Sequence, residues 1–153
     1  MTNLSTAIEY TVAEPKKKAL SKVECARIHK EAWSAANKAA FSHKPTPMIV
    51  GTPGANGQID PKKGNVYYVG SGVCGFAWVE IHPARGSFVN YLKSKEIGRK
   101  SDYYGGWHIS SNLKNLFKDP RVQSMEIAEA WACTYASVLN SYGIPARANS
   151  RMD

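Results

Sequence analysis

A chain of 153 residues with 43% hydrophobic and 21% charged residues can bury a core of its own, and this composition excludes a disordered or fibrous protein. The formal net charge of +8 at pH 7 and the isoelectric point near 9.4 favour an anionic partner, such as nucleic acid or a nucleotide. No stretch approaches the roughly 18 apolar residues of a membrane span, and residues 1–10 lack the layout of a signal peptide. We therefore expect a cytoplasmic protein without membrane contact.

The cysteines and histidines indicate no metal site and no disulfide framework. Cys25, Cys74 and Cys133 are odd in number, lie far apart and form no C-x-x-C pair. We expect them to be reduced thiols that pack as small buried hydrophobic residues. The histidines show no H-x-x-x-H spacing, so the sequence predicts neither a metal nor another cofactor.

Residues 1–19 are predicted to form an N-terminal arm. Ile8, Tyr10 and Val12 alternate with polar residues, as one face of a short strand does. A charged break with three consecutive lysines follows at residues 14–18. An arm with one apolar face needs a partner, either an edge of its own sheet or a neighbouring subunit.

A long helix is predicted to begin at Lys22, because Ser21 and Glu24 have the capping-box spacing. It should end before Pro45, since a proline disfavours the helical conformation of the residue before it. Helical spacing predicts one buried stripe of small and apolar residues. Its members are Cys25, Ile28, Ala32, Ala35 and Ala39.

Three strands are predicted next along the chain. Residues 48–50 and 66–69 are short apolar runs separated by a glycine-rich loop over 51–64. Residues 73–81 are apolar at both odd and even positions. A strand with two apolar faces is typical of the centre of a sheet covered on both sides, so we expect both of its faces to be buried.

The remaining chain predicts a short helix capped by Ser87, then a strand or a glycine-bent hairpin arm over 103–109. A second long helix opened by Ser124 and a terminal strand over 144–149 follow. Gly143 and Pro145 form the stop signal between the last two. This order predicts an α+β fold, with a mainly antiparallel central sheet of about four or five strands and two long helices and one short helix packed on it. Residues 20–153 should form a single domain.

Cys74 and His108 are the only nucleophile and base that we consider as a catalytic pair. Cys74 lies among apolar residues, which disfavour the reactive thiolate. The sequence therefore favours a non-catalytic protein over a small Cys/His enzyme.

A basic and aromatic segment is the strongest candidate for a binding site. Cations track phosphates and exposed rings stack on bases in proteins that bind single strands. A second basic group lies on the terminal strand, where two arginines on one face could hold a phosphate. The alternative is that the rings are core residues and the cations a solvated rim. The candidates are Lys93, Lys95, Arg99, Lys100, Tyr103, Tyr104 and Trp107 in the segment, and Arg147 and Arg151 on the strand.

Several short motifs resemble those of an uncharacterised family of small bacteriophage-encoded proteins. They are the Pro-Thr-Pro-Met run at 45–48, Gly-Val-Cys-Gly-Phe-Ala-Trp-Val at 72–79, Tyr-Gly-Gly at 104–106, Gln-Ser at 123–124, Gly-Ile at 143–144 and Ser-Arg-Met-Asp at 150–153. The resemblance covers roughly residues 26–153. It implies a phage origin and expression in the cytoplasm of a bacterial host, and it transfers no catalytic or binding residue.

Three functions remain open on these grounds. The first is a phage accessory protein that binds nucleic acid or a nucleotide without catalysis and modulates host machinery or host defence. The second is a protein-interaction or virion component that assembles into a homo-oligomer, or on a phage or host protein, through the arm at 1–19. The third is the small enzyme using Cys74 or His108.

Overall fold

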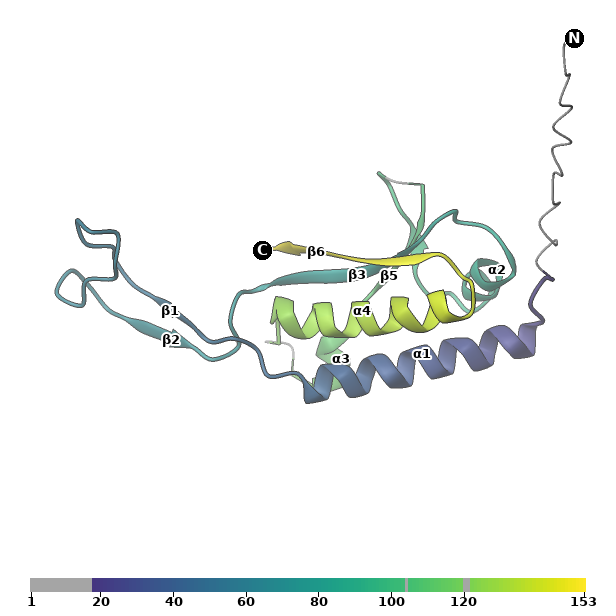
Figure 1. Ribbon diagram of the computed structural model, residues 1–153, viewed down its shortest axis with the longest axis horizontal. Coiled ribbons are helices and arrows are strands. Elements are labelled where there is room, and N and C mark those ends of the chain that lie inside the picture. The colour runs from purple at the N-terminus through teal and green to yellow at the C-terminus, as the bar shows by residue number, and fades with distance from the viewer. Residues whose placement is uncertain (1–17, 104, 120–121) are drawn as a thin grey trace, which may run out of the picture.

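The computed structural model describes residues 18–103, 105–119 and 122–153, and these form the predicted α+β fold (Figure 1). The predicted arm strand at Ile8–Val12 lies outside the described residues. The helices are α1 (Lys22–Ser42), α2 (Ser87–Ser94), α3 (Leu113–Phe117) and α4 (Met125–Ser141). The strands are β1 (Met48–Val50), β2 (Tyr67–Val69), β3 (Gly75–Ile81), β4 (Arg99–Lys100), β5 (Trp107–Ser110) and β6 (Ala146–Met152).

The strands form two separate antiparallel sheets. The main sheet has four strands in the order β4-β5-β3-β6, with β3 between β5 and β6. The other sheet is the hairpin β1–β2, which projects from the body of the molecule at the left of Figure 1. The prediction of a central strand at 73–81 is confirmed in that β3 is an inner strand of the main sheet.

The first helix begins where its capping box predicts. The Glu24 backbone N–H donates to Ser21 Oγ at 3.1 Å, and the Ser21 backbone N–H donates to Glu24 Oε2 at 2.7 Å. The buried stripe differs from the prediction in its second half, where Ala36 and Ala40 replace Ala35 and Ala39. The cause is geometric, because an α-helix has 3.6 residues per turn and no whole-number spacing stays on one face. The positions that face a given partner therefore shift gradually along a long helix.

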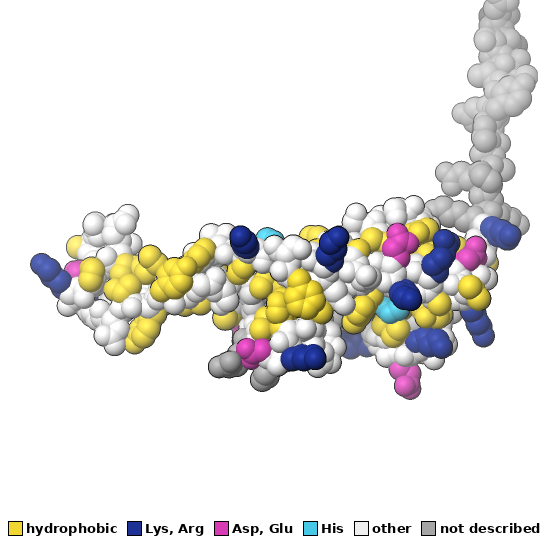
Figure 2. Space-filling view, turned by 90° about the horizontal axis from the view of Figure 1, so that it is seen from below, with side chains coloured by type: hydrophobic (Ala, Val, Ile, Leu, Met, Phe, Trp, Pro, Cys, Tyr) yellow, Lys and Arg dark blue, Asp and Glu magenta, His cyan; other side chains and the backbone are white. Residues whose placement is uncertain are grey.

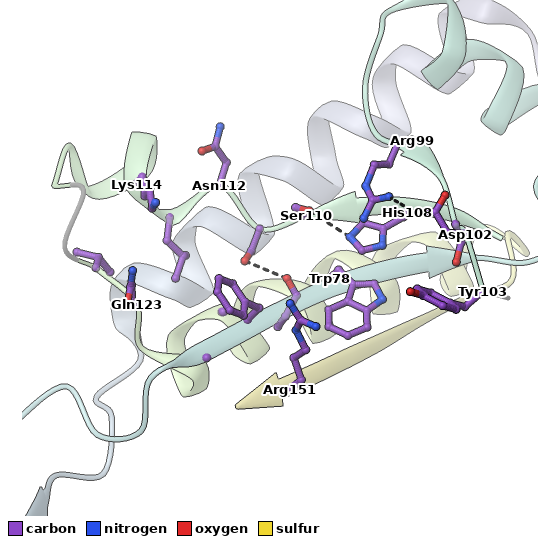
Figure 3. A pocket seen from close by; sticks show the side chains of 18 residues that line it. Trp78, Arg99, Asp102, Tyr103, His108, Ser110, Asn112, Lys114, Gln123 and Arg151 are labelled. Carbon is purple, nitrogen blue, oxygen red and sulfur yellow. Dashed lines mark hydrogen bonds and ion pairs between the residues drawn. The ribbon is translucent and has the colours of Figure 1, made fainter. Parts of the chain in front are cut away.

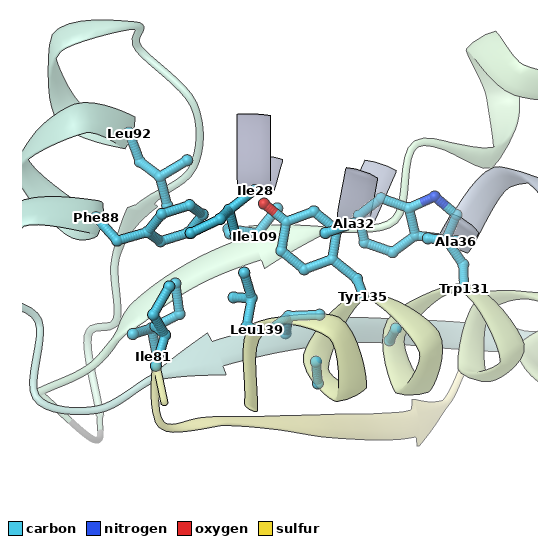
Figure 4. Close-up of a cluster of buried hydrophobic side chains, with 14 of the residues drawn as sticks. Ile28, Ala32, Ala36, Ile81, Phe88, Leu92, Ile109, Trp131, Tyr135 and Leu139 are labelled. Carbon is cyan, nitrogen blue, oxygen red and sulfur yellow. The ribbon is translucent and has the colours of Figure 1, made fainter. Parts of the chain in front are cut away.

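The core lies between the sheet and the helices (Figure 4). Helix α4 packs against β3 and β6, and α1 packs against α4 on the side away from the sheet (Figure 1). The alanines of both helices let the two backbones approach closely, and large side chains fill the remaining space. The largest of these are Ile28, Ile81, Leu92, Ile109, Trp131, Tyr135 and Leu139, all at most 2% exposed.

Among the described residues, only one face of the main sheet is covered, so the prediction of two buried faces for β3 is wrong. The odd positions Ala77, Val79 and Ile81 are buried against the helices. On the other face Phe76 keeps 43% of its surface exposed and Trp78 is half-buried. The helices of the described chain cover one side of the sheet, and the aromatic residues of the even positions are left on the other.

Some details lie outside the sequence predictions. Ser87 is the first residue of α2 and not its cap, since Gly86 holds that position; the Ser87 hydroxyl instead accepts the Leu20 backbone N–H at 3.0 Å. The short helix α3 and the two-residue strand β4 carry too little periodicity to be predicted. In the described part of the chain, none of the helices has the length and apolarity to cross a membrane.

A titratable pair joins the two long helices. His29 Nδ1 lies 2.7 Å from the Tyr135 hydroxyl oxygen, and burial lowers the pKa of His29 below its ordinary 6.5. The folded protein therefore favours neutral His29, whereas the unfolded chain takes up the proton near pH 6.5. Stability from this group is present above pH 6.5 and is lost as the pH falls through the folded-state pKa.

We expect the free energy of unfolding to fall as the pH is lowered from about 7.5 to about 5.5, and to fall less in the His29→Gln variant. Urea unfolding at a series of pH values measures this. Glu24 and Glu126 have pKa values lowered below 4.5, so their titration lies outside this window. Burial also lowers the pKa of His108, so part of the pH dependence should remain in His29→Gln. His82→Gln, at an exposed residue, is the control. An unchanged pH slope in His29→Gln contradicts the assignment.

Candidate nucleic-acid interface

The uncovered face of the main sheet is the candidate site, and we call it the open face. The strand register decides which side chains share it, because residues directly opposite each other on neighbouring strands point to the same side. Residues from all four strands meet there in rows. The rows are Arg99, His108, Glu80 and Arg147; then Ser110, Trp78 and Asn149; then Phe76 and Arg151.

A pocket of about 540 Å³ lies over this face (Figure 3). Phe76 and Trp78 on β3 and His108 on β5 line it on the open face, and we call these three residues its floor; buried residues of the helix-covered side, such as Ala77 and Ala128, line it as well. Loop residues after β4, including Tyr103, line one end, and residues near α3, including Lys114, line the other. A volume of this size lies within the range of sites that take small molecules or single nucleotides.

The aromatic side chains of the floor form platforms on which a planar group can stack. The rings of Trp78 and His108 are nearly parallel, at an angle of 5° and a centroid distance of 5.4 Å. Phe76 precedes Trp78 by two positions on the same face of β3, and Tyr103, which is 89% exposed, lines the same pocket (Figure 3). These rings together line one side of the pocket with apolar surface that water does not favour.

Arginines stand around these rings. The Arg151 guanidinium lies over the Phe76 ring, 5.4 Å from its centroid, in cation–π contact. Arg99 Nη1 forms an ion pair with Asp102 Oδ2 at 3.0 Å, and both side chains are largely exposed. The pocket therefore combines rings with positively charged groups that can reach a phosphate.

Glu80 is a buried carboxylate at the end of the open face. It is 1% exposed, although Phe76 and Trp78 on the same face are accessible. Its oxygens lie 3.5 Å from Arg147 Nη2 and 3.5 Å from Asn149 Nδ2. Gly106 packs over it so closely that an added Cβ would lie 2.6 Å from Glu80 Cγ. Glu80 thus orients two side chains of β6 and is itself closed to a ligand.

His108 is neutral near pH 7. Burial lowers its pKa, the positive charge of Arg99 lowers it further, and the charges of Glu80 and Asp102 oppose these effects. His108 Nε2 lies 3.2 Å from the Ser110 hydroxyl oxygen. A neutral ring is well suited to stack on a base, and one of its nitrogens can accept or donate a hydrogen bond.

The structure brings together part of the binding residues predicted from sequence. Arg99, Tyr103 and Arg151 line the pocket, and Arg147 shares the open face. Tyr104 lies outside the described residues.

The other predicted binding residues lie away from the open face. Trp107 pairs with Ile81 and Lys100, which places both Trp107 and Lys100 on the helix-covered side. The Trp107 indole N–H donates to the Ile97 carbonyl at 2.9 Å, and Lys93 Nζ lies 5.3 Å from the centre of its ring. These residues hold α2 and β5 together. Lys95 ends α2.

Cys74 and His108 do not lie side by side. Cys74 precedes Glu80, the partner of His108, by six positions on one extended segment, which corresponds to about 20 Å along the strand. Cys25 is buried as expected, whereas Cys74 and Cys133 are exposed, so the prediction of burial is wrong for these two. Within the described residues, no group of three or more His, Cys, Asp or Glu side chains could hold a metal ion.

Phe76, Trp78 and Ser110 also line the pocket, although the sequence did not predict them as site residues. The two aromatic residues were assigned to a buried face because their strand is apolar at nearly every position. Glu80 was the signal in the sequence that could have identified this face, since Phe76, Trp78 and Glu80 all occupy even positions of β3 and so share one side of the strand. A carboxylate in that series indicates a face that is not uniformly packed against apolar elements.

No protein-family model matches this chain, and neither the curated proteins nor the solved structures searched include a match.

Proposed function

We propose that the protein binds single-stranded nucleic acid on the open face, without catalysing a reaction on it. The observation that carries this proposal is the pair of accessible rings, Phe76 and Trp78, on the floor of a pocket flanked by Arg99 and Arg151. Stacking of a base on an aromatic side chain contributes about 1–3 kcal/mol, whatever the base. Arginines beside such rings supply the contacts to phosphate.

The spacing of the rings favours a single strand over a duplex. Alternate residues of a strand such as Phe76 and Trp78 are about 6.6 Å apart. That is roughly twice the 3.4 Å rise between stacked nucleotides in a duplex strand. Bases that lie on both rings must therefore be separated from each other, and only unpaired nucleotides can adopt that arrangement.

The polar groups of the open face suit an anionic ligand. Asp102 already pairs with Arg99, but both side chains are more than half exposed, and an exposed ion pair of this kind contributes little to stability. Exchange of the Asp102 carboxylate for a phosphate therefore costs little. Glu80 bears the remaining negative charge of the face, and Gly106 shields it from the ligand.

The resemblance to small bacteriophage-encoded proteins suggests where such binding would take place. In that setting the protein is an accessory factor in an infected bacterial cell, where binding to single-stranded DNA or RNA would shield the strand or redirect host machinery. The excess of Lys and Arg over Asp and Glu, 20 against 12, supports an anionic partner of this kind.

Fluorescence anisotropy with labelled oligonucleotides about 12 nucleotides long tests the proposal. We expect binding of single-stranded DNA or RNA, weaker binding of the matching duplex, and weaker binding still of a mononucleotide. If Arg99, Arg147 and Arg151 each neutralise one phosphate, the affinity falls about 20-fold between about 50 and 200 mM salt. In the double variant Arg99→Gln, Arg151→Gln, most of this salt dependence disappears.

Lys22→Gln, Lys30→Gln is the matched control, since it removes two charges from exposed positions of α1 and leaves the open face intact. This control should bind nearly as tightly as the unchanged protein. The proposal fails if no oligonucleotide binds at low salt. It also fails if the arginine and lysine variants lose affinity equally, because binding then follows net charge and not the open face.

A further inference from the structure

The hydrogen-bond ladder of the main sheet has a gap beside β3. The backbone groups of even-numbered residues of β3 face β6; next to the strand, for example, the Asp153 N–H donates to the Cys74 carbonyl at 3.1 Å. The odd-numbered residues therefore turn their N–H and carbonyl groups toward β5. Strand β5 ends at Ser110, which lies opposite Trp78. Residues 75–77 of β3 thus extend past the end of β5.

Two loop segments pair with this stretch and leave one carbonyl and one N–H between them. On one side, the backbone N–H and the hydroxyl of Ser111 donate to the Ala77 carbonyl at 3.4 and 3.2 Å. On the other, the Gly75 N–H donates to the Gln123 carbonyl at 2.9 Å. Among the described residues, no hydrogen bond uses the Gly75 carbonyl or the Ala77 N–H. Both residues are buried, and a buried backbone group without a partner costs free energy.

The pocket over the open face extends into this gap, and we call the inner part the slot. Gly75, Ala77, Ser111 and Gln123 line the pocket, and so does Ala128 of α4 on the helix-covered side. Ala128 is 1% exposed, and α1 packs against α4. The slot is therefore closed on the α1 side, which is the surface shown in Figure 2, and a ligand enters it from the open face.

The walls of the slot are largely apolar. Leu113, which is 6% exposed, and the half-buried Val122 line the pocket on the side of the two loop segments, and Phe76 lies at the entrance. An apolar site with a few placed polar groups is typical of pockets for small flat molecules. A carbonyl beside an N–H complements the edge of a nucleobase, because every base carries an N–H donor next to an acceptor.

We propose that one base of the bound strand enters the slot edge-on, where it donates to the Gly75 carbonyl and accepts the Ala77 N–H. This inference rests on the proposed function, since the base belongs to a strand on the open face. Lys114, exposed at the same end of the pocket, can neutralise the phosphate of that nucleotide (Figure 3). Rings such as Phe76 stack on any base, whereas the slot requires a base with a free edge, which a duplex does not offer.

Three single strands of about 12 nucleotides test this inference by anisotropy titration. They consist of deoxyuridine, thymidine or 3-methyldeoxyuridine throughout. Methylation at N3 removes the donor of the base edge, whereas the methyl group of thymidine lies at C5 and leaves the N3–H free. The three strands have the same charge and flat rings. We expect similar affinities for the first two, and about 5- to 150-fold weaker binding of the third, the range for lost base-edge contacts.

Hydrogen exchange of single amides, followed by NMR, locates the contact. The Ala77 amide should exchange readily in the free protein and at least about 10-fold more slowly with the deoxyuridine strand bound. The Val79 amide, which faces Ile109 in the paired part of the ladder, is the internal control and should exchange slowly in both states. The 3-methyldeoxyuridine strand at saturation should leave the exchange of Ala77 fast.

The outcomes separate this inference from the function on which it rests. Equal affinities of the three strands overturn the inference and leave binding on the open face in place, since stacking needs no free base edge. An Ala77 amide that the bound strand does not protect overturns it too. If free deoxyuridine at the same nucleotide concentration protects Ala77 as well as the strand does, the slot holds free nucleosides and the inference is wrong. If none of the strands binds at low salt, the proposed function fails together with the inference.

Discussion

Replacing Trp78 with alanine is expected to weaken binding of single-stranded nucleic acid by about 5- to 150-fold, the equivalent of one lost base stack of about 1–3 kcal/mol. Trp78 is the largest accessible ring on the pocket floor, and it stacks on His108. Its loss removes the platform for one base and leaves His108 without its stacked neighbour. Anisotropy titration at fixed salt gives the ratio of affinities directly.

Two further variants separate stacking from damage to the fold. Trp78→Phe keeps a ring and should recover most of the lost affinity. Phe41→Ala removes an aromatic side chain that is 58% exposed, contacts Phe117 and lies outside the pocket, so its affinity should match that of the unchanged protein. The salt dependence of Trp78→Ala should stay as it was, because no phosphate contact is lost. An unchanged affinity in Trp78→Ala contradicts stacking on the open face.

Replacing Trp131 with alanine is expected to lower the free energy of unfolding by about 3–5 kcal/mol. Trp131 is 1% exposed, stacks on Tyr135 at 5.2 Å and meets Trp33 edge-on at 5.3 Å. Its indole N–H donates to Asn37 Oδ1 at 3.0 Å, which ties α4 to α1. The truncation leaves a cavity between the two long helices, and Asn37 loses its partner.

Thermal and urea unfolding measure this effect. For a chain of this size the midpoint temperature should fall by between about 6 and 20 °C. Trp131→Phe retains much of the volume without the N–H and should lose less stability than the alanine variant. Val23→Ala, on the exposed side of α1, should change stability by about 0.5 kcal/mol or less. Equal losses in Val23→Ala and Trp131→Ala would contradict a core centred on this ring.

The local signals in the sequence determined where the long helices begin and end. Ser21 and Glu24 form the predicted capping box, and Ser124 caps α4 by accepting the Ile127 backbone N–H. Such signals act within a few residues, so no distant part of the chain is needed to interpret them. The alternation of apolar and polar residues in the last strand is also a local signal, and it placed Arg147 on one face and Ala148 on the other.

Only the tertiary structure decided which side of the sheet is the open face. Phe76 and Trp78 would suit a buried face as well as a binding surface, because both environments favour aromatic rings. The outcome depends on how many helices pack on the sheet and on which side, and those contacts join segments far apart in the sequence. The same holds for the hairpin β1–β2: its strands could be predicted from the sequence, but their separation from the main sheet could not. Strand propensity is local, whereas pairing and burial are properties of the whole fold.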